Sequence, residues 1–326
     1  MRIGFAAVFA AALAAVSLVA LAQKTEKVHR IGFLGSASAA ANENRLDAFR
    51  QGLRDLGYFE GRNIVIEYRW AEGNYERLPA LARELLARNP ELIVSTGGRP
   101  PVRALRDATK TVPVVFLTSD PVAEGIVLSL GRPGGNFTGL DVFTIELDTK
   151  RLALLKEALP AASRVVYLWN PLNASGAPQV SRTEIAARVL NVRLEPVEAR
   201  VPGDIDAAFA AMARERPDAL LVAADPMLDS QHKRIVDLAL KNRLPAMYQW
   251  REHVEDGGLI SYGASLPALY RRLAIYVDRV LKGEKPAELA VEQPTTYELV
   301  VNLRTAKALG VAIPQSVLVR ADHIVQ

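Results

Sequence analysis

The chain has 326 residues, half of them hydrophobic and 23% charged, and its formal net charge at pH 7 is +4. This composition excludes an intrinsically disordered chain, because it supplies enough apolar side chains for a core. The basic residues are spread along the chain without a run of five, which disfavours nucleic acid as a partner. The complete lack of cysteine excludes disulfides and thiolate metal sites.

The first 22 residues have the pattern of a secretory signal peptide. A basic start precedes a long apolar run, which ends in small residues at Ala20 and Ala22. We expect cleavage between Ala22 and Gln23 and export of the remaining chain to a bacterial periplasm. Because the chain has no cysteine, it cannot be anchored to a membrane through a lipid on a cysteine. The alternative is an uncut membrane anchor, because residues 3–22 would just span the hydrocarbon core as a helix.

From residue 29 onward, short β-branched runs alternate with amphipathic helical stretches. The helix predicted over residues 42–56 carries Leu46, Phe49 and Leu53 at spacings of three and four, which places them on one face. Such alternation builds βαβ units and predicts parallel sheets that helices cover on both faces. The predicted strands are residues 29–35, 63–68, 91–95, 112–117, 164–169, 192–197, 219–223, 244–248 and 295–302.

A passage rich in Gly and Pro, over residues 118–140, interrupts this alternation. Such punctuation marks turns or a crossing between domains. A fresh series of βα units begins after it. We therefore predict an α/β protein of two doubly wound parallel-sheet lobes, each of about 150 residues, joined by a hinge strand near residues 136–143.

The carboxyl ends of the predicted strands carry the candidate ligand-binding residues. In parallel α/β sheets ligands bind beyond these ends, and the helix starts nearby favour a carboxylate or another anion. The candidates are Ser36, Thr96, Gly97, Gly98, Ser119, Asp120, Asn170, Asn173, Asp225, Tyr248 and Tyr262. Each has a structural alternative, since such residues also cap helices, form turns or pack between lobes. Trp250, close to Tyr248, is a further aromatic candidate for either stacking on a ligand or interlobe packing.

The chain offers few catalytic or metal-binding patterns. Its four histidines, His29, His232, His253 and His323, are not spaced as metal ligands. The nucleophile-elbow, Walker and dinucleotide-binding glycine patterns are all missing from the sequence. We therefore predict no metal, no cofactor and no enzymatic activity.

Several segments together resemble one protein family. The more specific are Asp-Pro-Val at residues 120–122 and Pro-Gly-Gly-Asn-Phe-Thr-Gly at residues 133–139. The other matching segments are residues 30–34, 49–64, 113–116 and 299–310. In these residues the chain resembles the ABC-transporter substrate-binding family of the type I periplasmic binding fold, which includes tryptophan- and phenylalanine-binding members. It departs from the family's pattern at residues 95–100, and it lacks the lipid-bearing cysteine of many members.

The resemblance implies two lobes that are joined by three hinge crossings and close on a ligand. Lobe 1 would comprise residues 29–141 and 251–284, and lobe 2 would comprise residues 142–250 and 285–326. The ligand would be an amino acid or a similar carboxylate. The residues that match the family's binding loops are Thr96, Ser119 and Asp120 in lobe 1, and Asn170, Asn173 and Asp225 in lobe 2.

We expect, on these grounds, a periplasmic solute-binding protein of an ABC importer. It would be a monomer whose partners are a small ligand and an ABC permease in the inner membrane. Ser36, Thr96 and Ser119 would hold the ligand carboxylate. Asp120 or Asp225 would pair with an ammonium group, and Tyr248 or Tyr262 would pack on the apolar part.

Three alternatives remain open at this level. The same lobes could present a ligand to a membrane receptor or histidine kinase, as a sensor module. A two-lobed α/β enzyme fits less well, because nucleophile motifs are missing. A DNA-binding repressor of similar lobe structure fits poorly, because no helix-turn-helix pattern precedes the first strand.

Overall fold

The computed structural model of the chain describes residues 27–142 and 144–326, with residues 144–146 described by their backbone alone. The expected signal peptide and its cleavage point lie outside the described residues, and so does Phe143 of the expected hinge strand. Within the described ranges, no helix is both long enough and apolar enough to cross a membrane.

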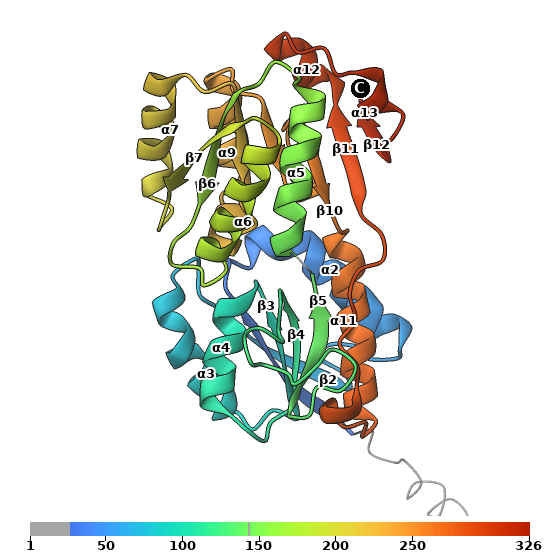
Figure 1. Ribbon diagram of the computed structural model, residues 1–326. Helices are drawn as coiled ribbons and strands as arrows, with labels where there is room; N and C mark the ends of the chain where they lie inside the picture. Colours follow the sequence, from blue (N-terminus) through green and yellow to red (C-terminus); the bar gives the residue numbers. More distant parts are fainter. Residues whose placement is uncertain (1–26, 143) are drawn as a thin grey trace, which may run out of the picture.

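Two α/β lobes lie one above the other, and the chain passes between them three times (Figure 1). Lobe 1, at the bottom of the view, contains β1 (His29–Gly35), η1 (Ala40–Asn42), α2 (Glu43–Asp55), β2 (Ile64–Trp70), η2 (Tyr75–Arg77), α3 (Leu78–Leu86), β3 (Leu92–Thr96), α4 (Arg99–Ala108), β4 (Val114–Thr118), β5 (Phe137–Asp141), α11 (Leu266–Leu281) and η3 (Pro286–Glu288).

Lobe 2 takes the middle and the end of the chain. It contains α5 (Thr144–Ala158), β6 (Arg164–Trp169), α6 (Gly176–Val189), β7 (Arg193–Glu198), α7 (Asp204–Glu215), β8 (Ala219–Val222), α8 (Pro226–Ser230), α9 (His232–Lys241), β9 (Ala246–Tyr248), α10 (Arg251–Glu255), β10 (Ile260–Gly263), β11 (Glu298–Asn302), α12 (Leu303–Leu309), α13 (Gln315–Leu318) and β12 (His323–Val325).

The strand order confirms the predicted doubly wound α/β class. Lobe 1 has a five-stranded sheet in the order β2-β1-β3-β4-β5, and all of its pairings are parallel. Lobe 2 has a seven-stranded sheet in the order β12-β11-β10-β9-β8-β6-β7, in which the described pairing of β10 with β11 is antiparallel and the others are parallel. The three-residue β12 was not predicted, because it is too short to show a periodic pattern.

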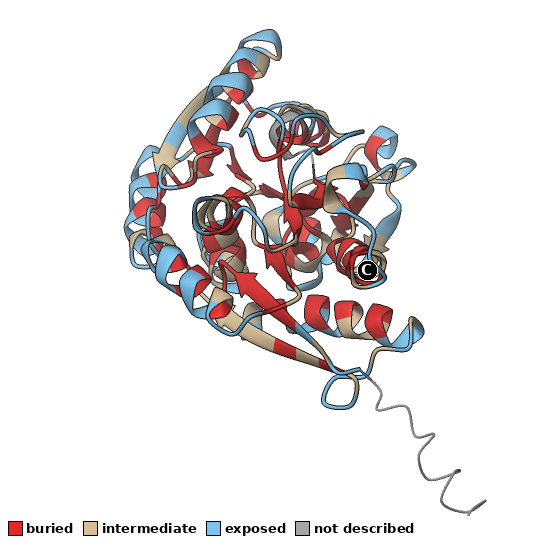
Figure 2. Cartoon of the chain, turned by 90° about the horizontal axis from the view of Figure 1, so that it is seen from below, coloured by how far each residue is buried: buried red, intermediate tan, exposed pale blue. Residues whose placement is uncertain are grey.

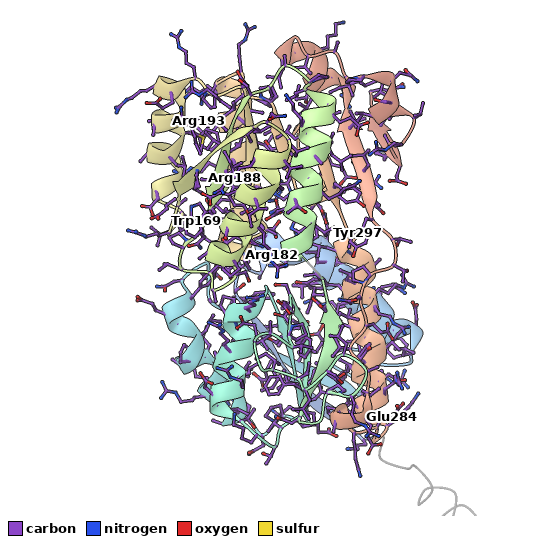
Figure 3. All side chains as sticks on the ribbon, in the orientation of Figure 1. Trp169, Arg182, Arg188, Arg193, Glu284 and Tyr297 are labelled. Carbon is purple, nitrogen blue, oxygen red and sulfur yellow. The ribbon has the colours of Figure 1, made fainter. Side chains whose placement is uncertain are left out.

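Apolar strands form the centre of each lobe, and amphipathic helices cover them (Figure 2). In α2, the predicted stripe of Leu46, Phe49 and Leu53 is buried in the lobe 1 core together with residues of α11. The two helices approach so closely at Gly52 that a Cβ there would lie 2.9 Å from that of Ala274. Charged side chains lie on the outer surface of both lobes, for example Arg188 and Arg193 of lobe 2 and Glu284 of lobe 1, which are labelled in Figure 3.

The predicted return of the chain to lobe 1 at residue 251 is wrong. Ile260 pairs with Met247 of β9 and with Val301 of β11, so α10 and β10 belong to lobe 2. The physical reason is that a buried strand must complete its backbone hydrogen bonds, and β10 does so only within the lobe 2 sheet. The chain returns to lobe 1 at α11 instead.

The predicted departure from lobe 1 at residue 284 also comes too early. The Thr138 hydroxyl donates to the carbonyl oxygen of Leu289 at 2.6 Å. The N–H of Glu292 donates to the carbonyl oxygen of Gly139 at 3.1 Å. Residues 285–292 are therefore attached to β5 in lobe 1. The third crossing follows them and leads into β11.

Candidate ligand-binding cleft

A cavity lies between the two lobes, where strand ends from both sheets face each other. The space between its walls is about 680 Å³, including the part that is open to solvent. Its lobe 1 wall comes from Ser36, Ala37, Asn42, Arg45, Thr96, Gly97, Gly98, Arg99, Leu117, Ser119, Leu266 and Tyr270. Lobe 2 and the first crossing add Val142, Asn173, Ser175, Ala224, Asp225, Pro226, Asp229 and Trp250.

The structure brings most of the sequence-predicted candidates to this cavity. Because the carboxyl ends of parallel strands share one edge of a sheet, segments far apart in sequence converge there. The candidates that line the cavity are Ser36, Thr96, Gly97, Gly98, Ser119, Asn173 and Asp225.

Four candidates do not line the cavity. Tyr248 is buried in the lobe 2 core, with its ring centroid 5.1 Å from that of His253. Tyr262 stacks on Tyr297 at 5.9 Å. Asn170 donates a hydrogen bond to Asp225, which does line the cavity. Asp120 is partly exposed, and its carboxylate lies 3.6 Å from the guanidinium of Arg99. The two tyrosines extend from strands of the lobe 2 sheet, and their rings pack within that lobe.

The loop after β3 has a conformation that requires glycine. Gly97 and Gly98 have φ angles of +91° and +79°, and a Cβ on Gly97 would lie 2.0 Å from the Ser36 hydroxyl oxygen. That hydroxyl donates to the carbonyl oxygen of Gly97 at 2.8 Å, which ties the ends of β1 and β3 together. Helix α4 begins directly afterwards, at Arg99. The amino end of a ten-residue helix thus forms part of the cavity wall. Its dipole favours negative charge, although Pro100 and Pro101 of the first turn have no N–H to donate.

Asp225 is buried and already has partners within the protein. It precedes α8, and its carboxylate accepts hydrogen bonds from backbone and side-chain donors of both lobes. The donors are the N–H groups of Met227 and Leu228 at 2.9 and 3.0 Å, the amides of Asn170 and Asn173 at 3.3 and 2.9 Å, and the Tyr75 hydroxyl at 3.0 Å.

These contacts change the role that we expected for Asp225. Burial raises the pKa of its carboxyl, and the hydrogen bonds from Leu228 and the two asparagines oppose this shift. A carboxylate offers about four lone-pair positions. With five donors it has none to spare for a ligand ammonium group, so its observed role is to cap α8.

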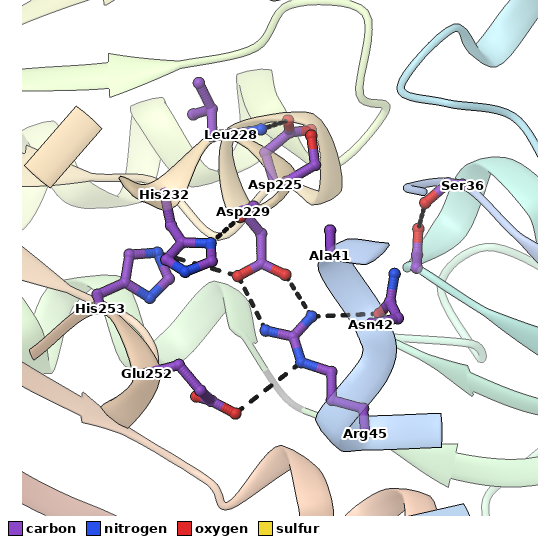
Figure 4. A network of polar contacts seen from close by, with 12 residues as sticks. Ser36, Ala41, Asn42, Arg45, Asp225, Leu228, Asp229, His232, Glu252 and His253 are labelled. Atoms are coloured by element: carbon purple, nitrogen blue, oxygen red, sulfur yellow. Dashed lines mark hydrogen bonds and ion pairs between the residues drawn. The ribbon is translucent and has the colours of Figure 1, made fainter. Parts of the chain in front are cut away.

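A charged network lies beside the cavity (Figure 4), and its members Arg45 and Asp229 line the cavity wall. Arg45 of α2 reaches across to Asp229 of α8 and makes two hydrogen bonds, with N–O distances of 2.5 and 3.1 Å. Glu252 lies 3.9 Å from the Arg45 Nε atom, and the His253 ring is 3.9 Å from the Asp229 carboxylate. Burial opposes ionisation of Asp229, but Arg45 outweighs it, so the pKa of Asp229 is lowered.

Several cavity residues were missed because they lie on helices. Asn42 precedes α2 and Arg45 lies within it, while Leu266 and Tyr270 belong to α11. The carboxyl ends of strands can be recognised in the sequence, but they do not indicate which helical residues face the other lobe. Trp250 was recognised as aromatic, and it does line the cavity. In the described part of the chain, no group of three or more His, Asp or Glu side chains is arranged to hold a metal ion.

Comparison with known proteins gives consistent matches over nearly the whole chain. Residues 31–325 match the family model described as ABC transporter substrate binding protein. A tyrosine-binding protein of Clostridioides difficile (strain R20291) is 24% identical over 286 residues, which are 87% of this chain and 82% of that protein.

Two solved structures are similar in both sequence and fold. A conserved domain protein from Vibrio cholerae is 28% identical and superposes with a TM-score of 0.85, over 91% of this chain and all of the other. An ABC domain from Streptococcus pneumonia in complex with L-Trp is 25% identical, with a TM-score of 0.83 over 92% of this chain and all of the other.

Proposed function

The chain belongs to the family of ABC transporter substrate-binding proteins, and from that premise we propose that it is the periplasmic solute receptor of an ABC importer. Its ligand is a small α-amino acid or a related carboxylate, which binds between the lobes. The supporting observation is the interlobe cavity, whose walls combine an anion-favouring helix end with apolar side chains.

The two kinds of wall match the two parts of such a ligand. The carboxylate binds at the start of α4, near the hydroxyl groups of Thr96 and Ser119. The apolar part lies against Trp250, Leu117 and Leu266.

The ammonium group pairs with Asp229. This carboxylate lines the cavity, and among the side chains that the structure describes Arg45 donates its two hydrogen bonds. Two of its roughly four lone-pair positions are thus left for a ligand, unlike those of Asp225. This assignment replaces the expected pairing with Asp120 or Asp225.

Binding, and not bond making, is the proposed mechanism. Both lobes contribute to the cavity walls, so a ligand contacts the complete set only when the lobes are closed. The ligand shifts the population toward the closed form by its differential affinity for that form. The permease then recognises the closed protein.

A panel of ligands tests this function by calorimetry and thermal unfolding. L-Trp, L-Tyr and L-Phe come first because relatives bind tryptophan and tyrosine. Aliphatic amino acids, tryptamine without a carboxylate, and indolepropionate without an ammonium complete the panel. A ligand at a hundred times its dissociation constant stabilises the protein by about 2.7 kcal/mol. If no member of the panel binds, the proposed ligand class is wrong.

Matched tryptophan variants locate the binding site. Trp250→Leu removes an aromatic ring from the cavity wall and should weaken binding of the best ligand. Trp169→Leu removes a ring that is not part of that wall, at the position labelled in Figure 3, and should leave the affinity unchanged. Uptake of the labelled ligand by cells with and without the protein separates an importer from a sensor.

A further inference from the structure

Lobe 1 holds the short helix α8 of lobe 2 at both ends. At its start, the Tyr75 hydroxyl donates to Asp225 at 3.0 Å and accepts from the N–H of Met227 at 3.1 Å. Near its end, Arg45 makes its two hydrogen bonds to Asp229. We call these five residues the α8 clasp. The clasp joins positions about 150 to 184 residues apart in sequence.

Apolar contacts accompany the polar ones. The Tyr75 ring packs against the buried cores of both lobes. On either side of it, the lobe 1 backbone at Gly73 and Gly98 lies within van der Waals reach of α8. A Cβ on Gly73 would lie 3.6 Å from the Met227 side chain, and a Cβ on Gly98 would lie 3.5 Å from Pro226.

The clasp can form only when the lobes are closed. Its members come from two lobes that are joined through hinge crossings, so opening separates Arg45 from Asp229 and Tyr75 from Asp225. Water then replaces both sets of contacts. Within lobe 2, Asp225 keeps the backbone and amide donors that cap α8, so α8 stays capped in the open form.

Tyr75 is suited to this contact in its protonated form. Burial, together with the nearby Asp225, raises the pKa of its hydroxyl. The hydroxyl therefore remains a donor to the Asp225 carboxylate. Tyr75 is not among the residues that line the cavity, so a ligand there does not contact its hydroxyl directly.

We propose that Tyr75 and Arg45 are positioning residues that set the ligand affinity of this protein through the free energy of lobe closure. This inference rests on the function proposed above. If only the closed form binds tightly, the apparent dissociation constant rises as the closed fraction of the free protein falls. Tyr75 thus contributes to affinity from outside the cavity lining, whereas Arg45 and Asp229 are also part of the cavity wall.

Fluorescence energy transfer between the lobes measures this closure directly. Because the chain has no cysteine, Ala87→Cys in lobe 1 and Ser181→Cys in lobe 2 provide two unique and exposed labelling positions. The closed fraction is measured without ligand, and then during titration with L-Trp or the best ligand of the panel. The doubly labelled protein is measured without a further change and with Tyr75→Phe, with Arg45→Met or with the control Arg50→Met.

Arg50 is a matched control for Arg45. It lies on the same helix and its loss removes the same charge, but its ion pairs with Asp47 and Glu60 stay within lobe 1. Arg50→Met should therefore behave as the wild type. Tyr75→Phe keeps the packed ring and loses only the hydroxyl.

We expect Tyr75→Phe to lower the closed fraction of the free protein and to raise the ligand concentration for half-closure roughly threefold to tenfold. Arg45→Met leaves Asp229 buried and unpaired in the ligand-free closed form, so the ratio of closed to open protein without ligand should fall about a hundredfold. Combining Arg45→Met with Asp229→Leu should restore much of the ligand-free closed fraction, because an apolar pair can replace a buried ion pair.

The proposal is overturned if Tyr75→Phe matches the wild type in both the ligand-free closed fraction and the half-closure concentration. It is also overturned if Arg50→Met has the same effect as Arg45→Met. The proposed function fails separately, when no ligand closes the wild type. In that case a lower ligand-free closed fraction in Tyr75→Phe still supports the clasp.

Discussion

The side chain of Arg151 donates from its Nε atom to the carbonyl oxygen of Tyr262, at 2.7 Å. Arg151 is completely buried in α5, which begins just after the first crossing between the lobes, and Tyr262 lies at the end of β10, just before the second. The same guanidinium pairs with the buried Asp148, whose other oxygen accepts a hydrogen bond from the Tyr167 hydroxyl at 2.5 Å. This contact therefore anchors two neighbouring crossings to the core of lobe 2.

Arg151→Met should lower the free energy of unfolding by about 3–5 kcal/mol, because it leaves the Asp148 carboxylate buried without its cation. Urea unfolding followed by circular dichroism measures the change. Arg188→Met is the control, since this exposed arginine of α6 is labelled on the outside of lobe 2 in Figure 3. Equal stability of the two variants would show that the buried pair does not hold α5.

Asp225→Ala should lower the free energy of unfolding by about 2–4 kcal/mol, because it removes the cap of α8 and leaves several buried donors unpaired. Ligand affinity should fall in the same variant, since α8 also forms part of the cavity wall. Calorimetry and urea unfolding measure the two effects. Asp237→Ala, an exposed change on α9, should alter neither. A loss of affinity with full stability would instead indicate that Asp225 contacts the ligand.

Gly97→Ala should cost about 1–3 kcal/mol of stability, because its positive φ angle suits glycine and the new methyl group would collide with Ser36. Displacement of Ser36 and of the start of α4 should also weaken ligand binding. Gly131→Ala is the matched control, since a Cβ there has no neighbour within 4 Å. Thermal unfolding and calorimetry of both variants provide the comparison, and equal behaviour would rule out the collision.

His253 should make the protein less stable as the pH falls below about 6.5. Burial lowers the pKa of its imidazole to about 3, with Asp229 opposing this shift and His232 contributing to it. Between these two pH values the unfolded chain binds a proton that the folded chain does not, so acid favours unfolding. From pH 7 to pH 5 this residue accounts for a loss of about 2 kcal/mol.

His253→Gln should remove this part of the pH dependence, and His323→Gln, at an exposed position, should keep it. Urea unfolding at pH 7 and pH 5 measures the difference between the two variants and the wild type. Parallel pH profiles for His253→Gln and the wild type would contradict the assignment to His253.

The strand and helix pattern could be predicted from sequence because it is local. The strands predicted at residues 29–35 and 164–169 coincide with β1 and β6, and most of the others differ by one or two residues at an end. The candidates at strand ends could be predicted for a related reason. Parallel strands place their carboxyl ends on one edge, so residues such as Thr96 and Ser119 must lie near each other.

The orientation of side chains at those strand ends could not be predicted in the same way. Tyr248 and Asn173 follow the same sequence rule, yet the first packs into the lobe 2 core and the second faces the cavity. Which side chain faces a ligand depends on the packing of neighbouring elements. The placement of β10 in lobe 2 has the same origin, because strand pairing is decided by contacts between distant segments.

The sequence alone therefore determined the two α/β lobes and the set of strand ends that meet between them, because periodicity and turn residues act over a few neighbouring positions. Tertiary structure alone decided the partners of the buried charges. Arg45 and Asp229 are 184 residues apart, and no local pattern links them. Their pairing depends on how two complete lobes approach each other, because a buried charge is stable only beside a partner that the fold brings to it.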